Sequence, residues 1–358
     1  MQADFLEALE ELERERGIRK EVLLSAIEAA LLSAYRRNFS SAQNARVEID
    51  PQAGEFHVYA QKEVVEHVGD PRLQIALDDA RQIDPRYEVG DILEQEVTPH
   101  DFGRVAAQTA KQVVMQRIRE AERGLIYEEF LDREEDVMTG LVQRQDARYV
   151  FVNLGKAEAL LPQSETLPTD HLRTGDRIKV LITRVERSNK GPQIYASRTH
   201  PTFVKRLLEL EVPEIYNGIV EIRSVARDPG YRCKVAVYSN NDQVDPVGAC
   251  IGPRGQRIQA VVNELRGEKI DVIAWSIDPE EFVANALAPA KPTHVWIDDE
   301  RVARVTVPDA QLSLAIGKEG QNARLAAKLT GWKIDIRGES DAVHAFDLEA
   351  LPNEENDR

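Results

Sequence analysis

The first part of the chain alternates between helical and strand-like spacing of apolar residues. Apolar positions three or four apart predict helices over 4–16 and 18–37, interrupted at Gly17. The stretches 46–49 and 55–60 alternate apolar and polar residues around a turn that contains Pro and Gly, so they predict a β-hairpin. The chain therefore begins as a mixed α and β domain.

The same pattern continues to a long helix. We expect a strand at 62–68, a short helix at 72–83 and a strand that opens at Gly90-Asp91 and runs to Val97. Residues 103–130 are rich in Ala, Gln, Arg and Glu and predict one long helix. This helix ends the first domain and links it to the next.

The pattern changes to short strands after residue 136. Polar turns separate five β-like runs, at 137–144, 147–154, 156–161, 177–187 and 193–198. Five short strands in about 65 residues indicate a small OB-type barrel.

Residues 202–338 contain two units with the same order of elements, which is helix, strand, strand, helix, Gly-x-x-Gly, helix, strand. The first unit has these elements at 202–210, 218–226, 232–239, 245–251, 256–266 and 269–275. The second has them at 279–287, 293–298, 301–307, 309–316, 321–330 and 332–337. Each unit is predicted to be an α+β domain with a three-stranded sheet backed by helices.

Both units carry Ile-Gly-x-x-Gly-Gln between two predicted helices, in segments 247–272 and 312–336. This arrangement fits the loop of KH domains, where glycines permit a tight helix–turn–helix and leave room for a nucleic-acid backbone. The N-terminus of the following helix offers free N–H groups to phosphate. Two copies in the same setting predict an extended surface for a single strand.

The candidate RNA-binding residues of the two loops follow from this interpretation. They are Gly252, Pro253, Arg254, Gly255 and Arg257, and Gly317, Lys318, Glu319, Gly320 and Arg324. Apolar neighbours are expected to form a groove floor for bases, and they are Ile251, Ile258, Val261, Ile316 and Leu325. Glu319 repels phosphate, so the first loop is expected to bind more strongly than the second.

The barrel segment adds aromatic and basic candidates. Tyr149 and Phe151 alternate with Val150 and Val152, so one pair faces the barrel core and the other faces outward. If the aromatic pair faces outward, it forms a platform for stacking bases, and otherwise it fills the core. Six cations are candidate phosphate contacts or solvated surface residues: Arg144, Arg148, Arg184, Arg187, Lys190 and Arg198.

Charge is unevenly distributed along these 358 residues, whose formal net charge is −16. The excess of acid lies in residues 1–130 and 339–358, whereas 131–338 is close to neutral. RNA contact is therefore expected in the middle, the acidic front suggests a protein-binding surface, and the tail is predicted to be disordered. Two cysteines, and no apolar run long enough to span a bilayer, predict a cytoplasmic protein without disulfides or membrane contact.

The sequence offers little for an enzyme, a cofactor or a metal. The seven histidines are scattered, and no metal-ligand spacing, phosphate-binding loop or nucleophile motif is present. The acidic run 298–300 is explained by a charged turn. We therefore expect a protein that is not an enzyme, with no catalytic residues, no metal and no cofactor.

Four strings in the KH region resemble the NusA family of bacterial transcription termination/antitermination factors. These are 226–230 (ARDPG), 245–252 (DPVGACIG), 285–290 (NALAPA) and 316–326 (IGKEGQNARLA). The resemblance implies a multidomain α+β fold, namely an N-terminal α+β domain with a long linking helix, an S1/OB-type barrel and two tandem type II KH domains. The implied boundaries are 1–130, 131–199, 200–277, 278–338 and an acidic tail at 339–358.

The resemblance also implies a function and partners. It implies a monomeric elongation factor that binds core RNA polymerase and nascent single-stranded RNA, meets further elongation and antitermination factors, and modulates pausing, termination and antitermination. Arg198 matches a basic position that the family associates with RNA contact. Two alternatives stay open, an accessory module of a ribonuclease and a ribosome-associated RNA-binding protein. Phosphorolytic ribonucleases place KH before S1 after a large catalytic core, whereas here the order is reversed.

Overall fold

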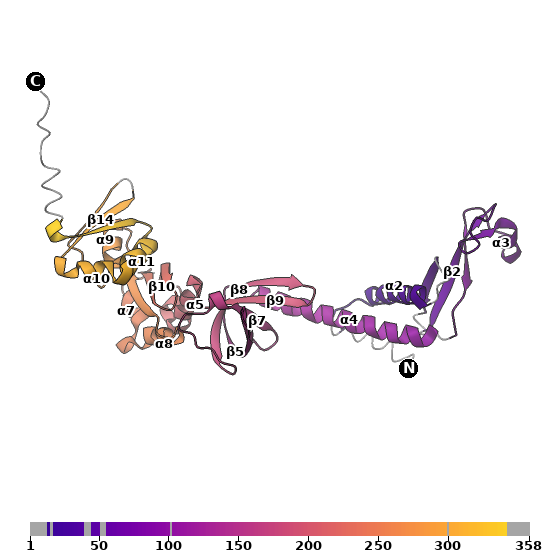
Figure 1. Cartoon of the computed structure of the whole chain (residues 1–358), viewed down its shortest axis with the longest axis horizontal. Coiled ribbons are helices and arrows are strands. Elements are labelled where there is room, and N and C mark those ends of the chain that lie inside the picture. The colour runs from indigo at the N-terminus through magenta and orange to yellow at the C-terminus, as the bar shows by residue number, and fades with distance from the viewer. Residues whose placement is uncertain are drawn as a thin grey trace, which may run out of the picture. The chain divides into compact units, whose positions relative to one another are not determined.

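The computed structural model describes residues 13–14, 17–38, 44–50, 55–100, 102–298 and 301–341. The chain divides into two compact parts, Met1–Ile126 and Tyr127–Arg358, called here the N-terminal part and the C-terminal part. The N-terminal part is a sheet with helices, and the C-terminal part is a barrel followed by two domains of helices and sheet (Figure 1). The predicted multidomain α+β fold class is confirmed.

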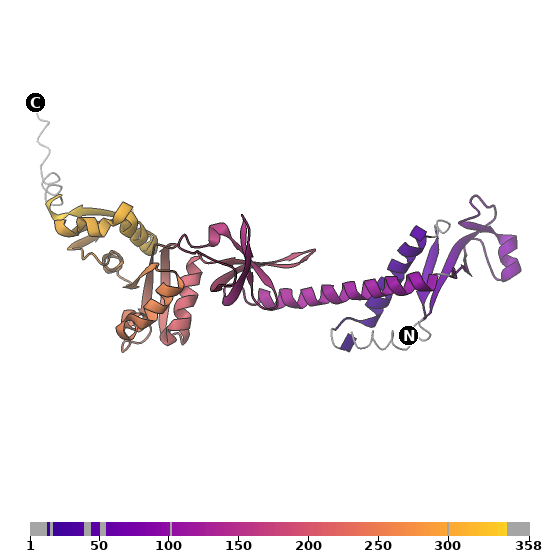
Figure 2. The same ribbon diagram turned by 60° about the horizontal axis from the view of Figure 1, so that its bottom comes forward.

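The N-terminal part has a four-stranded sheet in which β2 pairs with each of the other strands. The elements are α2 (Lys20–Asn38), β1 (Ala45–Ile49), β2 (Phe56–Val65), β3 (Gln74–Ala76), α3 (Leu77–Ile83), β4 (Ile92–Glu96) and α4 (Phe102–Leu131). Strands β1 and β4 run antiparallel to β2, and β3 runs parallel to it. Helix α4 is uninterrupted over 30 residues (Figure 2).

The core of this part lies between α2, the sheet and the start of α4. Ile27 and Leu31 of α2 are fully buried, as is Val58 of β2. Tyr35 meets Phe102 of α4 edge to face, with ring centroids 5.8 Å apart. The helical spacing of apolar residues in α2 therefore marks the face that packs on the sheet.

The predicted helices at 18–37 and 103–130 and the predicted hairpin strands are confirmed. The separate strand at 62–68 is wrong, because β2 continues without a break to Val65. The helix predicted from residue 72 is wrong at its start, because Gln74–Ala76 pairs with Glu63–Val65 as a strand. Pairing with a distant segment decides these three residues, and local spacing does not record it. Most of the predicted helix 4–16, and the turn at 51–54, lie outside the described residues.

The C-terminal part opens with a closed five-stranded barrel, in the strand order β5-β6-β7-β9-β8. Its elements are β5 (Val137–Gln145), β6 (Tyr149–Asn153), β7 (Glu158–Pro162), η1 (Gln163–Glu165), β8 (Arg177–Ser188) and β9 (Gly191–Ser197). Strands β7 and β9 pair in parallel, and the other neighbours are antiparallel. The predicted five-stranded barrel is confirmed.

The two domains predicted as KH domains follow, each with an antiparallel strand pair and a third strand parallel to the middle one. The first has α5 (Pro201–Glu211), α6 (Pro213–Tyr216), β10 (Val220–Asp228), β11 (Arg232–Ser239), α7 (Pro246–Ile251), η2 (Pro253–Gly255), α8 (Gln256–Glu264) and β12 (Lys269–Ala274). The second has α9 (Pro279–Ala286), β13 (His294–Ile297), β14 (Val302–Val307), η3 (Asp309–Gln311), α10 (Leu312–Ile316), η4 (Lys318–Gly320), α11 (Gln321–Thr330) and β15 (Lys333–Gly338).

Local sequence explains where two of these helices begin. Asp245 accepts a hydrogen bond from the Val247 N–H, and Asp278 accepts one from the Glu280 N–H. In both helices proline follows the capping aspartate, at the first helical position, where it has no hydrogen bond to lose.

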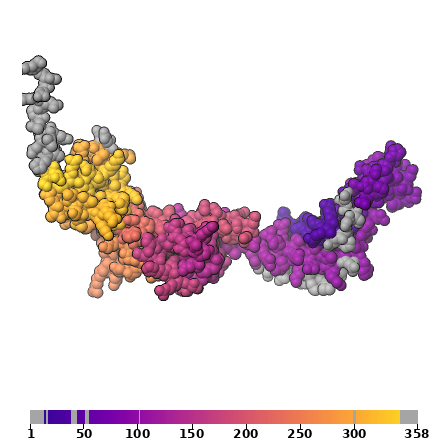
Figure 3. Space-filling model, in the orientation of Figure 1, coloured from indigo at the N-terminus to yellow at the C-terminus, as the bar shows by residue number. Residues whose placement is uncertain are grey.

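Continuous cores join the three domains of the C-terminal part. One core combines Leu167 and Leu181 of the barrel with helices and strands of the first KH domain. Another combines Ala226, Ala236 and Ile273 of the first KH sheet with helices of the second domain. The orange and yellow surfaces of the two KH domains abut in Figure 3. Residues 339–341 are helical, and residues 342–358 lie outside the described residues, so the disordered tail stays a prediction.

Candidate RNA-binding interface

The two Gly-x-x-Gly loops have the same backbone conformation, position by position. Gly252 and Gly317 have φ of 72° and 78°, Gly255 and Gly320 have 74° and 72°, and each loop closes with a hydrogen bond of 3.1 Å from the second glycine N–H to the first glycine carbonyl. Arg254 and Glu319, the third residue of each loop, both have φ of 54°. A shared conformation that includes a left-handed non-glycine residue indicates that both loops present the same surface.

The two glycines of each loop serve different purposes. A Cβ on Gly252 would lie 2.7 Å from Arg257 Cγ, and one on Gly317 would lie 2.8 Å from the Asn322 backbone N, so the first glycine permits close packing onto the next helix. A Cβ on Gly255 or Gly320 would meet nothing within 4 Å. The second glycine therefore borders open space, where a ligand backbone can approach.

The charges of the two loops differ as the sequence indicates. Arg254 and Lys318 are exposed and pair with no carboxylate within the described ranges. Glu319 is exposed beside Lys318. The exposed charges of the loop residues therefore sum to +1 in the first loop and to zero in the second.

Arg324 and Gln321 tie the second loop to the first KH domain. The Gln321 amide donates to Asp228 Oδ2 at 2.7 Å, and the Arg324 guanidinium lies 3.8 Å from the same carboxylate. Arg324 stays half exposed and also donates to the Glu319 carbonyl. Asp228 ends β10, so the second loop is fixed against the sheet that precedes the first loop.

Arg257, predicted to contact RNA, is engaged inside the first KH domain. Its guanidinium donates to Glu214 Oε2 at 2.8 Å and to the Ala249 carbonyl at 2.7 Å, so its charge is used within the first KH domain. Of the predicted groove floor, Ile251 and Ile316 are partly open to solvent, and Ile258 is half-buried against the core. Val261 and Leu325 are 1% exposed and belong to the domain cores, so they cannot contact bases.

The barrel aromatics face outward. Val150 and Val152 are buried in the barrel, which places Tyr149 and Phe151 on the outer surface of β6. The two rings meet edge to face at 6.3 Å. Of the two orientations that the alternation allowed, the structure therefore has the one that a base-stacking platform requires.

A row of aromatic and basic side chains extends this platform around the barrel. Register pairs Arg144 with Phe151, Phe151 with Leu160, Leu160 with Tyr195, and Tyr195 with Arg184. The Arg144 guanidinium carbon lies 3.4 Å from the Phe151 ring centroid, and that of Arg184 lies 4.6 Å from the Tyr195 centroid. Sequence spacing could not reveal this row, because Tyr195 and Leu160 join it only through barrel closure.

Arg198, predicted to contact RNA, is buried in this structure. The side chain is 1% exposed, and its guanidinium donates to Asp170, to Glu264 and to the backbone carbonyls of Lys179 and Glu264. It joins the barrel to the first KH domain and cannot reach a phosphate. A basic residue at the end of the last barrel strand, even one that matches a basic position of a family, does not show whether its side chain is buried or open to solvent.

The other barrel cations are exposed, with varied partners. Arg187 lies over the Tyr127 ring at 4.4 Å, and Arg184 also pairs with Glu186 at 3.0 Å. Arg148 and Lys190 form no ion pair within the described ranges.

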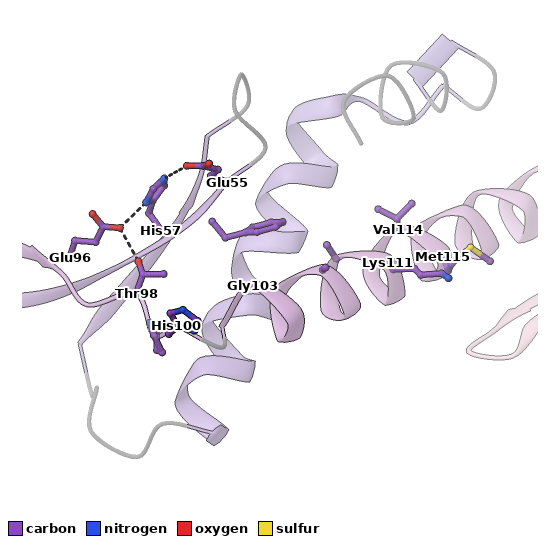
Figure 4. Close-up of a pocket in the computed structure, with 13 residues that line it drawn as sticks. Glu55, His57, Glu96, Thr98, His100, Gly103, Lys111, Val114 and Met115 are labelled. Atoms are coloured by element: carbon purple, nitrogen blue, oxygen red, sulfur yellow. Dashed lines mark hydrogen bonds and ion pairs between the residues drawn. The ribbon is translucent and has the colours of Figure 1, made fainter. Parts of the chain in front are cut away.

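The N-terminal part contains a groove of about 760 Å³ between the sheet and α4 (Figure 4). Its apolar lining comes mainly from Phe56 and from one face of α4, at Ala107, Ala110, Val114 and Met115. Polar residues border it, and among them the His57 Nδ1 lies 2.8 Å from Glu96 Oε1, which also accepts from Thr98. An apolar floor with a polar border is typical of a site that binds another protein.

Among the described residues, no group of three or more potential metal ligands is present. Within the same residues, every helix is too short or too polar to cross a membrane.

Four family models match consecutive segments of the chain. They describe a NusA N-terminal domain at residues 4–124, an S1 RNA binding domain at 131–197, a NusA-like first KH domain at 198–275 and a NusA-like second KH domain at 279–344.

Curated relatives cover nearly the whole chain. The transcription termination/antitermination protein NusA of Halalkalibacterium halodurans is 62% identical over 343 residues, which is 96% of this chain and 90% of the relative. That of Bacillus subtilis is 61% identical and covers 96% of this chain and 92% of its own length. The solution structure of the N-terminal domain of NusA from B. subtilis is 58% identical and covers 34% of this chain and 99% of that chain, with a TM-score of 0.32.

Proposed function

Because the chain belongs to the NusA family of transcription termination/antitermination proteins and is an RNA-binding transcription factor, we propose that it joins core RNA polymerase to nascent single-stranded RNA. In this proposal the protein acts in the cytoplasm as a monomer, without catalysis of its own. It modulates pausing, termination and antitermination together with further elongation factors. Residues 1–130 contact polymerase, and 131–199, 200–277 and 278–338 form the RNA track.

The observation that carries the RNA track is the matched geometry of the two Gly-x-x-Gly loops. Each loop places an open second glycine and an exposed cation at the N-terminus of a helix, where N–H groups also point toward a ligand. The barrel adds outward aromatic rings with arginines over them. The near-neutral charge of the region predicts modest affinity with a shallow salt dependence, which suits a factor past which RNA must slide.

The polymerase contact is supported by the acidic N-terminal part and its groove. Acidic surface disfavours RNA, and an apolar floor with a polar border favours a protein. We assign the groove between the sheet and α4 as part of this contact.

RNA binding is tested by reversing the charge of both loops. In an anisotropy titration with an unstructured fluorescent RNA, Arg254→Glu with Lys318→Glu should lose most of the affinity while circular dichroism stays unchanged. The control, Lys62→Glu with Arg72→Glu, makes the same change of net charge in the N-terminal part and should bind normally. Unchanged affinity of the loop variant would refute the proposed track.

The partner is tested by co-purification with core RNA polymerase and with ribosomal subunits. We expect polymerase to be retained, and Met115→Glu in the groove to weaken retention, because a charge is introduced on the apolar floor. The control Ile277→Glu places the same charge at a residue that is 87% exposed in the C-terminal part. Retention of ribosomal subunits alone would favour a ribosome-associated protein, and phosphate-dependent RNA degradation by the purified chain would favour a ribonuclease module.

A further inference from the structure

The outer face of the first KH sheet is covered by the second KH domain. Ala226, Ala236 and Ile273 on this face share a core with helices α9 and α11. Lys234, in the middle of the face, is fully buried and donates to the Ala288 carbonyl at 2.7 Å. Small side chains on the sheet allow the helices to approach closely.

The second KH sheet has an equivalent face, which the strand registers identify. Ala226 pairs with Lys234 and Lys234 with Asp271 in the first sheet, just as Trp296 pairs with Arg304 and Arg304 with Asp335 in the second. The same alignment matches Ala236 with Thr306 and Ile273 with Arg337. Small or aliphatic residues of the covered face are thus replaced by tryptophan, threonine and arginine.

No described residue of the chain covers this second face. Trp296 is 53% exposed, and the side chains of Arg304 and Arg337 are 54% and 51% exposed. The Arg304 guanidinium carbon lies 5.0 Å from the Trp296 ring centroid. Strand alternation places His294 and Lys333 on the same face, because Ile334 and Ile336 point into the core.

The chemistry of the face excludes another helix docked as in the first domain. Bulky and charged side chains at the positions of Ala226 and Ile273 prevent the close approach of a helix, and such a helix would remove these charged groups from water. Two carboxylates are present, Asp298 at 3.8 Å from Arg304 and Asp335 at 2.9 Å from Arg337, and they leave Lys333 and His294 without a carboxylate partner within the described ranges. A sheet surface with an open aromatic ring and several cations fits nucleobases and phosphates.

We propose that the open face of the second KH sheet binds a segment of single-stranded RNA. The Trp296 indole stacks on a base, and Arg304, Lys333 and Arg337 contact its phosphates. This proposal rests on the proposed function only in taking RNA as the ligand, since the surface is separate from both Gly-x-x-Gly loops. The open face of the second KH sheet would add a further RNA-binding surface to residues 131–338.

The experiment uses Trp296 as its own reporter. The full chain has three tryptophans, and Trp275→Phe with Trp332→Phe leaves Trp296 alone. Titration with an unstructured RNA should quench this fluorescence with saturation, and quenching should persist in the Arg254→Glu, Lys318→Glu background at higher RNA concentration. If anisotropy shows normal RNA binding but the fluorescence of Trp296 is not quenched, the inference is overturned and the proposed function stands. If the wild-type chain does not bind RNA at all, both the inference and the proposed function are overturned.

A second set of variants keeps Trp275 and Trp332 and changes Trp296 alone. Trp296→Ala should weaken RNA binding by about 5- to 150-fold, the equivalent of the loss of one stacked base at ~1–3 kcal/mol, and Trp296→Phe should restore most of it. Ile277→Ala is the matched exposed control. Unchanged affinity of Trp296→Ala for RNA would overturn the inference. Quenching of the single-tryptophan protein by poly-glutamate and not by RNA would also overturn it, in favour of an acidic protein partner.

Discussion

Arg198 at the end of the barrel donates through Nη1 to Oε1 of Glu264 at the end of α8, at 3.1 Å, and almost no water reaches the guanidinium. The same guanidinium forms a two-point contact with the fully buried Asp170. One arginine thus fixes the barrel against the first KH domain. This contact fixes the position of the outward aromatic row of the barrel relative to the first Gly-x-x-Gly loop, both of which lie in the C-terminal part.

Arg198→Met is expected to destabilise the C-terminal part by about 3–5 kcal/mol, because Asp170 would stay buried without its partner. Urea unfolding followed by circular dichroism measures the change. Arg177→Met, on the exposed side of β8, is the control and should stay within about 0.5 kcal/mol of the wild type. Equal stability of the two variants would contradict the structural role of Arg198.

Phe151→Ala is expected to weaken RNA binding while the barrel stays folded, because the ring lies outside the core. Loss of one stacked base corresponds to ~1–3 kcal/mol, or about 5- to 150-fold in affinity. Phe151→Tyr keeps the ring and should bind as the wild type does. Anisotropy titrations of the three proteins decide the point, and equal affinity for all of them would exclude stacking at this position.

Glu319→Gln is expected to tighten RNA binding by up to about 5-fold, since it removes a negative charge that costs ~1 kcal/mol beside a phosphate in water. Glu319→Lys should also steepen the plot of log affinity against log salt by about 0.7, because one more phosphate is neutralised. The exposed Glu280→Gln is the control. An unaltered salt slope for Glu319→Lys would mean that the second loop does not lie near the RNA backbone.

His57 and Glu96 are expected to titrate as a pair. Their hydrogen bond raises the pKa of His57 above its usual value of about 6.5 and lowers the pKa of Glu96 below its usual value of about 4.3. The stabilisation from His57 is fully present below pH 6.5 and is lost as the pH rises through the raised pKa. That from Glu96 is present above pH 4.3 and is lost as the pH falls through the lowered pKa.

An NMR titration of the imidazole tests this coupling. Glu96→Gln should lower the pKa of His57, because the acceptor of its hydrogen bond loses its charge. Glu66→Gln changes an exposed carboxylate elsewhere in the N-terminal part and should leave the titration unchanged. If the pKa of His57 is the same in both variants, His57 and Glu96 are not hydrogen-bonded in solution.

Much of the fold follows from local patterns. The duplicated Ile-Gly-x-x-Gly-Gln string predicts both KH loops, and the helical spacing in α2 and α4 predicts their extents to within two residues. The strand β3 cannot be predicted from local patterns, because Gln74–Ala76 becomes a strand only through pairing with β2. Local spacing describes one segment at a time, whereas sheet pairing depends on two.

The candidate site is predicted less completely, for a related reason. Arg254 and Lys318 are recognisable from their place in the loop, and both are exposed as expected. Arg198 and Arg257 have the same residue type and a similar setting, yet carboxylates 66 and 43 positions away bind them internally. The sequence does not show which cations have such partners, nor that Trp296 lies on an open face.

The two cysteines have a practical consequence for mapping the path of RNA. Cys233 and Cys250 are both free and buried, and burial raises the pKa of each thiol, that of Cys250 to about 12. Neither forms the thiolate that alkylating reagents require at neutral pH. A single cysteine introduced on a loop or an outer strand can therefore carry a photo-crosslinker or a dye in an otherwise unmodified chain. Its adducts would then record which nucleotide passes each point of the surface.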